Sequence, residues 1–215
     1  MAAREKADMS MQVFGPIFAE VFADQWDALP PVMRMHYANR PHSHDRVTVE
    51  GRLDVYIHPL MKPLAPLMAW LGLFAPWTGE AVPCTVQFRS QPDGNAFIFD
   101  RRFSFPGRKS YQFRSELVAK GPHDVIEYMR CGIGWRCSYS FEGGRVVLTH
   151  KGYIIRLFGL DIPLPGAGWI VGRGEAFEEA TGEASFSMFM ALNHALFGRL
   201  YSYSGVFTVT ETAVG

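Results

Sequence analysis

Charged side chains on several segments of this chain share a face with large apolar residues. In AFIFDRRFSF, residues 96–105, an alternation of period two places Arg101 on the same face as Phe99 and Phe103. The same count places other ionisable groups on apolar faces: Glu127, His150, Arg173 and Glu175. A charge that faces a core is costly unless it is paired, hydrated or directed into a cavity. These residues therefore predict a polar patch in an apolar chamber. The alternatives are a buried structural ion pair between Arg101 and Glu127, or exposure of some of these faces to solvent.

Such a patch could bind a ligand or move protons. The arginine fork pairs well with a carboxylate, so Arg101 is predicted to receive the acidic or carbonyl head group of a lipid-like ligand. The predicted lining consists of Phe97, Phe99, Phe103, Trp135, Tyr201 and Tyr203, with His150 and Glu175. The alternative is an enzyme in which Glu127 or His194 acts as acid or base, while Arg101 stabilises developing negative charge. Hydrogen-bonded packing is the competing interpretation for each lone histidine.

Three of the seven histidines fall within nine positions, in MRMHYANRPHSHD at residues 33–45. The HSHD part has the spacing of half a binuclear zinc site, but its aspartate stands one position early and Arg46 would oppose a dication. We therefore predict no metal site, and we place His42 and His44 in a solvated loop. His36 follows a proline-broken helix and is predicted to cap the mouth of the chamber as a candidate catalytic residue.

Other motifs for catalysis or cofactors are weak. No GxSxG elbow occurs, and Cys131 and Cys137 flank GIGWR without a nearby histidine. The segment GAGWIVGRG at 166–174 contains glycines but falls among predicted strands, so we predict no NAD binding and no other cofactor. Three cysteines at these spacings predict reduced thiols.

The composition limits the class of protein. Lys plus Arg and Asp plus Glu number 21 each, so no overall positive field attracts nucleic acid. The 215 residues contain 48% hydrophobic residues, which predicts a single domain over 1–215 with a large core. The N-terminal stretch lacks the apolar run of a secretory signal, so a cytoplasmic location is expected.

Alternation of apolar and polar residues predicts a mainly β (α+β) fold, with a helical segment over 1–45 and a β-barrel-like body over 46–211. Strands are expected at RVTVEGRLDVYI, at AVPCTVQFRS, and near 96–105, 110–119, 124–131, 134–142, 145–157, 168–180, 183–190 and 200–211. Short connections favour a roughly ten-stranded antiparallel meander, which avoids open edges by closing into a barrel or curved half-barrel around a chamber. Three glycines within 168–180 predict a bulge that would change the face count there.

The segment HPLMKPLAPLMAWLGLFAPW, residues 58–77, is apolar but is broken by four prolines and one lysine. Its uninterrupted part is too short to span a bilayer. We predict a short buried helix near 64–75, and the alternative is a segment that makes weak contact with a membrane surface.

The chain also resembles a known family. The likeness rests on ALPPVMRMH at 28–36, FDRRF at 99–103, IPLP at 162–165, GEAFEE at 174–179 and NHALFGRLYSYSGVF at 193–207. These stretches resemble the mainly bacterial family called domain of unknown function 4166, in which a tryptophan often stands at the position of Phe99. The resemblance covers nearly the whole chain and implies candidate positions without an activity: His36, Arg101, His194, Tyr201 and Gly205. Family members are also found fused to saccharopine-dehydrogenase-like nucleotide-binding halves, which implies an oxidoreductase partner.

Overall fold

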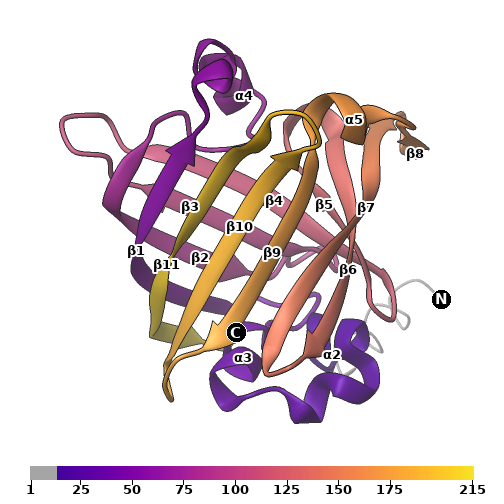
Figure 1. Cartoon of the computed structure of the whole chain (residues 1–215). Coiled ribbons are helices and arrows are strands. Elements are labelled where there is room, and N and C mark those ends of the chain that lie inside the picture. The colour runs from indigo at the N-terminus through magenta and orange to yellow at the C-terminus, as the bar shows by residue number, and fades with distance from the viewer. Residues whose placement is uncertain (1–13) are drawn as a thin grey trace.

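The computed structural model describes residues 14–215, which form an antiparallel β-barrel (Figure 1). The strands are β1 (Arg46–Ile57), β2 (Gly79–Arg89), β3 (Phe97–Phe103), β4 (Tyr111–Gly121), β5 (Asp124–Tyr128), β6 (Ile133–Glu142), β7 (Arg145–Leu157), β8 (Leu160–Pro163), β9 (Arg173–Ala180), β10 (Ser185–His194) and β11 (Gly198–Ala213). Their order in the sheet is β6-β5-β4-β3-β2-β1-β11-β10-β9-β7-β8, and a β6–β7 pairing closes the ring. Ten strands make the barrel, while β8 pairs only with the end of β7. The predicted fold class is confirmed, and closure decides for a barrel over a half-barrel.

The alternation in the sequence decides which face of each strand is buried. In β1, the apolar residues Val47, Val49, Leu53, Val55 and Ile57 are all buried, and Glu50 and Asp54 between them are exposed. A period of two puts alternate side chains on one side of the sheet, so these five point into the barrel. The rule holds equally in β2, where the apolar alternate positions are buried: Val82, Cys84, Val86 and Phe88.

Helices close the lower end of the barrel in Figure 1. They are α2 (Ile17–Phe22), the 3-10 helix η1 (Ala23–Ala28) and α3 (Pro31–His36). Phe18 of α2 inserts between strands, with its ring 4.9 Å from that of Phe97 and 5.3 Å from that of Tyr139. Pro30 precedes α3 in an extended conformation and separates it from η1. The helical prediction for the N-terminal segment applies here from Ile17 to His36, and its residues 1–13 lie outside the described residues.

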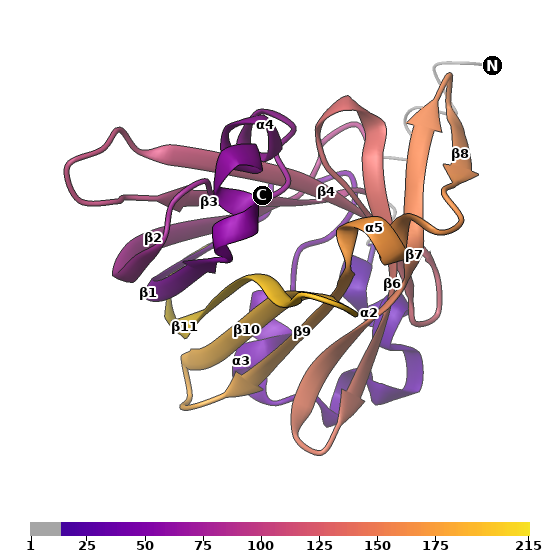
Figure 2. The ribbon, with the colours of Figure 1, turned by 45° about the horizontal axis from the view of Figure 1, so that its top comes forward.

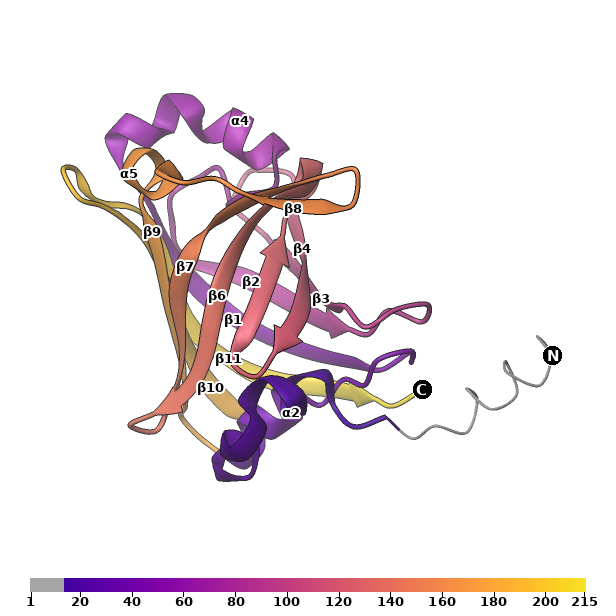
Figure 3. The same cartoon turned by 90° about the vertical axis from the view of Figure 1, so that its right-hand side faces the viewer.

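The upper end carries short, exposed helices: η2 (Pro59–Leu64), α4 (Ala65–Trp70) and α5 (Ala167–Val171) (Figures 1 and 3). The predicted buried helix over 64–75 is wrong in two respects. It ends earlier, because the chain turns at Gly72 with a φ of 69°, and Leu67 and Trp70 are 51% and 63% exposed. None of the helices in residues 14–215 has the length and apolar composition needed to cross a bilayer.

Segment 168–180 also differs from the prediction of one continuous strand. Gly166 and Gly172 have φ values of 83° and 99°, which are left-handed conformations that glycine adopts without strain. They bracket α5, so the strand begins only at Arg173. The alternation that was counted from Trp169 therefore does not predict which side chains of β9 point into the barrel.

Two glycines let β1 and β11 approach closely. A Cβ atom added at Gly205 would lie 1.9 Å from the carbonyl oxygen of Arg52, and one added at Gly51 would lie 2.2 Å from that of Val206. Both distances are far shorter than a van der Waals contact, so a side chain at either position would require the backbone to move. Close contact between the two strands therefore explains the glycine at position 205.

We expect Gly205→Ala to lower the free energy of unfolding by about 3 kcal/mol, because a methyl group must displace the β1 backbone. Urea denaturation followed by circular dichroism measures this value. Gly15→Ala is the control, since a Cβ at Gly15 meets nothing within 4 Å. Equal stabilities of the two variants would contradict the close approach.

Candidate functional site

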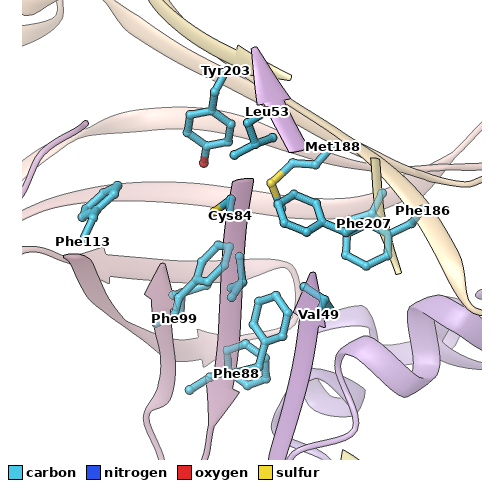
Figure 4. Close-up of a cluster of buried hydrophobic side chains, with 14 of the residues drawn as sticks. Val49, Leu53, Cys84, Phe88, Phe99, Phe113, Phe186, Met188, Tyr203 and Phe207 are labelled. Atoms are coloured by element: carbon cyan, nitrogen blue, oxygen red, sulfur yellow. The ribbon is translucent and has the colours of Figure 1, made fainter. Parts of the chain in front are cut away.

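The barrel encloses a cavity of about 500 Å³. Its walls come from most of the strands, from α3 at the lower end, and from η2, α4 and α5 at the upper end. Figure 4 shows part of this interior, with Tyr203 and Met188 facing Phe99 and Phe88, and Phe113 to one side. The lining is mostly apolar, and the ionisable groups in it form two clusters.

The first cluster joins four neighbouring strands. Arg101 on β3 donates from Nη2 to Glu127 Oε1 on β5 at 2.9 Å, and from Nη1 to Ser115 Oγ on β4 at 3.2 Å. Ser115 Oγ donates to the same Glu127 oxygen, and Trp135 Nε1 on β6 donates to Glu127 Oε2 at 2.5 Å. Arg101 and Glu127 are 4% and 6% exposed, so the ion pair is buried. Both residues nevertheless line the cavity.

The guanidinium of Arg101 lies between two aromatic rings. Its Cζ is 3.4 Å from the ring centroid of Phe99 and 4.3 Å from that of Phe113, within cation–π range. Burial lowers the pKa of Arg101, but Tyr203 and Glu127 outweigh it, and the pKa is raised above its usual value. The Nε–H group is buried and has no hydrogen-bond partner in the described residues. Arg101 therefore lines the cavity as a charged group whose five N–H donors are only partly used.

The second cluster lies toward the lower end, where α3 meets β9. Tyr37 donates to Glu178 Oε2 at 2.7 Å, and His36 Nε2 lies 3.4 Å from the same oxygen. Burial lowers the pKa of His36 to about 3, so this imidazole is neutral at physiological pH. Burial raises the pKa of Glu178 to about 7, although Tyr37 and the charge of Arg101 oppose the shift. Glu178 is therefore a carboxyl group that can gain or lose a proton near neutral pH.

Most of the predicted site residues lie together. The cavity is lined by Phe97, Phe99, Arg101, Glu127, Trp135, Tyr201, Tyr203 and His36. Phe103 is fully buried in the adjacent core but does not line the cavity. His36 is at the closed end, packed edge-on against Phe88 and Phe186, and so does not cap the mouth as predicted.

Three more predicted residues are not brought to the cavity. Glu175 is exposed and accepts a hydrogen bond from Asn193 Nδ2 at 2.8 Å. Its side chain points outward because β9 begins only after α5, which changes the alternation. His150 lies behind Trp135, where its Nδ1 accepts from the Gly174 amide at 2.9 Å; a bulge between β6 and β7 follows it. His194 ends β10, with its Nδ1 accepting from the Leu196 amide at 3.1 Å.

The sequence reasoning missed Glu178. On β9 the inward positions are Gly174, Ala176 and Glu178, the reverse of the predicted face. A Cβ at Gly174 would lie 2.0 Å from the Trp135 ring, so the glycine leaves room for that indole. Small residues at alternate positions were the available signal, since a wall facing a bulky aromatic needs them.

The histidine loop has no visible role in a site. His42 and His44 are both exposed, and His42 packs against Phe14 with ring centroids 5.5 Å apart. Arg40 and Asp45 form a bidentate ion pair that ties the loop to the start of β1. Over residues 14–215, no three His, Cys, Asp or Glu side chains converge as a metal site would require.

Comparison with known proteins supports the resemblance seen in the sequence. The family model described as "Domain of unknown function (DUF4166)" matches residues 29–207. The chain belongs to this family. The match begins just before α3 and ends in β11, so DUF4166 includes both polar clusters and the cavity. No protein with a curated description matches.

Solved structures show only distant similarity. A point mutant of the fluorescent protein UnaG has 14% identity and a TM-score of 0.33, covering 76% of this chain and 95% of its own. The dehydratase domain of the polyketide PpsC from Mycobacterium tuberculosis has 8% identity and a TM-score of 0.17, covering 87% of this chain and 82% of its own. Scores this low carry no information about the function of the DUF4166 barrel.

Proposed function

We propose that this barrel binds an apolar small molecule with an acidic or carbonyl head group. The observation that carries the proposal is the apolar cavity of about 500 Å³ whose lining includes Arg101, a buried guanidinium with Nε–H unpartnered in the described residues. Cavities of this size, with few polar groups in an apolar lining, suit small-molecule ligands. An oxygen atom of the ligand would satisfy the buried donor, which is costly to leave unpaired.

The surroundings of Arg101 explain how a head group would be oriented. Its two terminal nitrogens are held by Glu127 and Ser115, and its two faces are covered by Phe99 and Phe113. The N–H donors that Glu127 and Ser115 leave free, Nε–H among them, remain for a ligand. Because Glu127 already compensates the positive charge, one hydrogen bond to a carbonyl or carboxyl oxygen suffices, and no second charge is required.

Binding of an uncharged apolar fluorophore such as 1-aminoanthracene tests the cavity. We expect saturable one-to-one binding with a dissociation constant on the order of 1 μM. Ala176→Trp, which fills the cavity, should weaken it about tenfold, whereas Glu179→Trp on the outer face of β9 should leave it unchanged. Absence of saturable binding, or equal binding by both variants, would rule out an internal site.

A second candidate function is proton transfer on an apolar substrate. It is favoured by Glu178, whose pKa of about 7 suits a general acid or base. Glu127 accepts hydrogen bonds from three donors and is better placed to hold Arg101, and His194 is outside the cavity. If turnover of a substrate is found, Glu178→Gln should abolish it while fluorophore binding persists; retained turnover would exclude Glu178 as the acid or base.

A further inference from the structure

The upper end of the barrel is covered with exposed apolar side chains. Of the 18 large hydrophobic residues that are exposed in residues 14–215, 14 belong to segments 60–70, 157–171 and 196–197. The most exposed of these 14 are Phe158 at 104%, Leu196 at 83%, Ile170 at 81% and Trp169 at 73%. We call these three segments the rim. Figure 2 shows that α4, α5 and the chain leading to β8 surround this end of the barrel.

The cavity opens through the rim. Four residues that line the cavity are also exposed at the surface: Leu64, Leu164, Ile170 and Val171. All four belong to the rim, while the other end is closed by α2, η1 and α3. An apolar molecule would therefore enter or leave between α4 and α5.

Charge is segregated along the barrel axis, although the whole chain is neutral. The segments that form the upper end, 58–78, 104–110, 129–132, 156–173 and 193–199, contain seven Lys or Arg residues and one acidic residue, Asp161. Asp161 is itself paired with Arg156 and Lys120. The segments at the lower end, 14–45, 90–96, 122–123, 143–144 and 181–184, contain two Arg and six acidic residues. The apolar rim thus lies on a cationic end, opposite an anionic one.

We propose that the rim docks on an anionic lipid bilayer, with the cavity opening toward the membrane. Aromatic and aliphatic side chains on separate loops can enter the interfacial region, where tryptophan is favoured. Trp70 and Trp169 are 63% and 73% exposed on α4 and α5, at positions suited to this. The surrounding Lys and Arg side chains would be attracted to acidic headgroups, and the acidic lower end would be repelled, which fixes the orientation.

A second hollow beside η2 supplies a place for headgroups. Lys62 and Arg108 both line it, and Arg108 Cζ lies 4.7 Å from the centroid of the Trp77 ring. Neither cation forms an ion pair within the described residues. The inference does not depend on ligand binding in the cavity, since it rests on surface residues alone.

Flotation of the full chain with vesicles tests the inference. We expect the protein to float with vesicles of phosphatidylcholine and phosphatidylglycerol, and to float about tenfold less with phosphatidylcholine alone or at high salt. Phe158→Ser/Trp169→Ser should reduce flotation about tenfold. The control Met35→Ser/Val206→Ser removes two exposed apolar residues outside the rim and should float like the unaltered protein.

Reversing the charge of cationic residues at the upper end tests the electrostatic part of the proposal independently. Lys62→Glu/Arg108→Glu should reduce flotation with the acidic vesicles, and Arg34→Glu at the lower end should not. Circular dichroism of each variant verifies that the barrel is folded. The proposal is overturned if the protein floats with no vesicle, if rim and control variants float equally, or if sedimentation shows that the rim pairs two copies of the chain and is covered.

Discussion

Replacing Glu127 with alanine should lower the free energy of unfolding by about 3–5 kcal/mol, since it leaves the buried guanidinium of Arg101 uncompensated. The ion pair is 2.9 Å long and both side chains are less than 10% exposed. Loss of the carboxylate would also leave Trp135 Nε1 without its acceptor. Urea denaturation measures the change.

A surface ion pair on the same strand is the matched control. Asp124 pairs with Arg136 across β5 and β6, where the arginine side chain is 54% exposed, and Asp124→Ala should cost under about 1 kcal/mol. The double variant Arg101→Met/Glu127→Gln removes both charges and should recover most of the loss, because no isolated buried charge remains. The account of Arg101 and Glu127 fails if Glu127→Ala costs no more than Asp124→Ala.

Replacing Glu178 with glutamine should change how stability depends on pH. Burial raises the pKa of Glu178 from its ordinary 4.5 to about 7. The folded protein thus favours the protonated carboxyl group, whose contribution to stability is complete below about pH 4.5 and is lost as the pH rises through about 7. Glutamine stays neutral, so the variant should gain about 3 kcal/mol relative to the unaltered protein between about pH 4.5 and about pH 8.

Glu179→Gln, the exposed neighbour that pairs with Arg145, is the control and should track the unaltered protein. His36 titrates in the opposite sense: burial lowers its pKa to about 3, so its contribution is present above its ordinary 6.5 and is lost as the pH falls. The His36 contribution is the same in the unaltered protein and in Glu178→Gln, so it cancels when their free energies of unfolding are subtracted. A constant difference between Glu178→Gln and the unaltered protein across this range would show that Glu178 titrates normally.

The sequence predicted most of the barrel because its strands follow a simple rule. In β1 the buried face follows directly from the alternation of residue types, and the same count in β3 placed Arg101 with Phe97 and Phe99, which line the cavity with it. The sequence allowed an ion pair between Arg101 and Glu127 but could not decide between that pair and an unpaired guanidinium. The decision depends on the register of β3, β4 and β5, which the sequence does not show.

Prediction failed where the backbone departs from period two. Gly166 and Gly172 flank a short helix that the sequence did not predict. As a result, the face of β9 that points into the barrel is the opposite of the predicted one, and Glu178 lines the cavity where Glu175 was expected. The exposure of α4 was missed because an apolar segment predicts burial, and only the barrel's geometry shows that this one lies at an open end.

The most direct test of the central claim, that an apolar ligand binds inside with its head group at Arg101, is displacement of the bound fluorophore by dodecanoic acid, dodecan-2-one and dodecane. The unaltered protein should prefer the two oxygen-bearing compounds over the alkane by about tenfold. In Arg101→Met/Glu127→Gln this preference should disappear while the alkane still competes. Displacement by none of the three, or the same preference in both proteins, would contradict the claim.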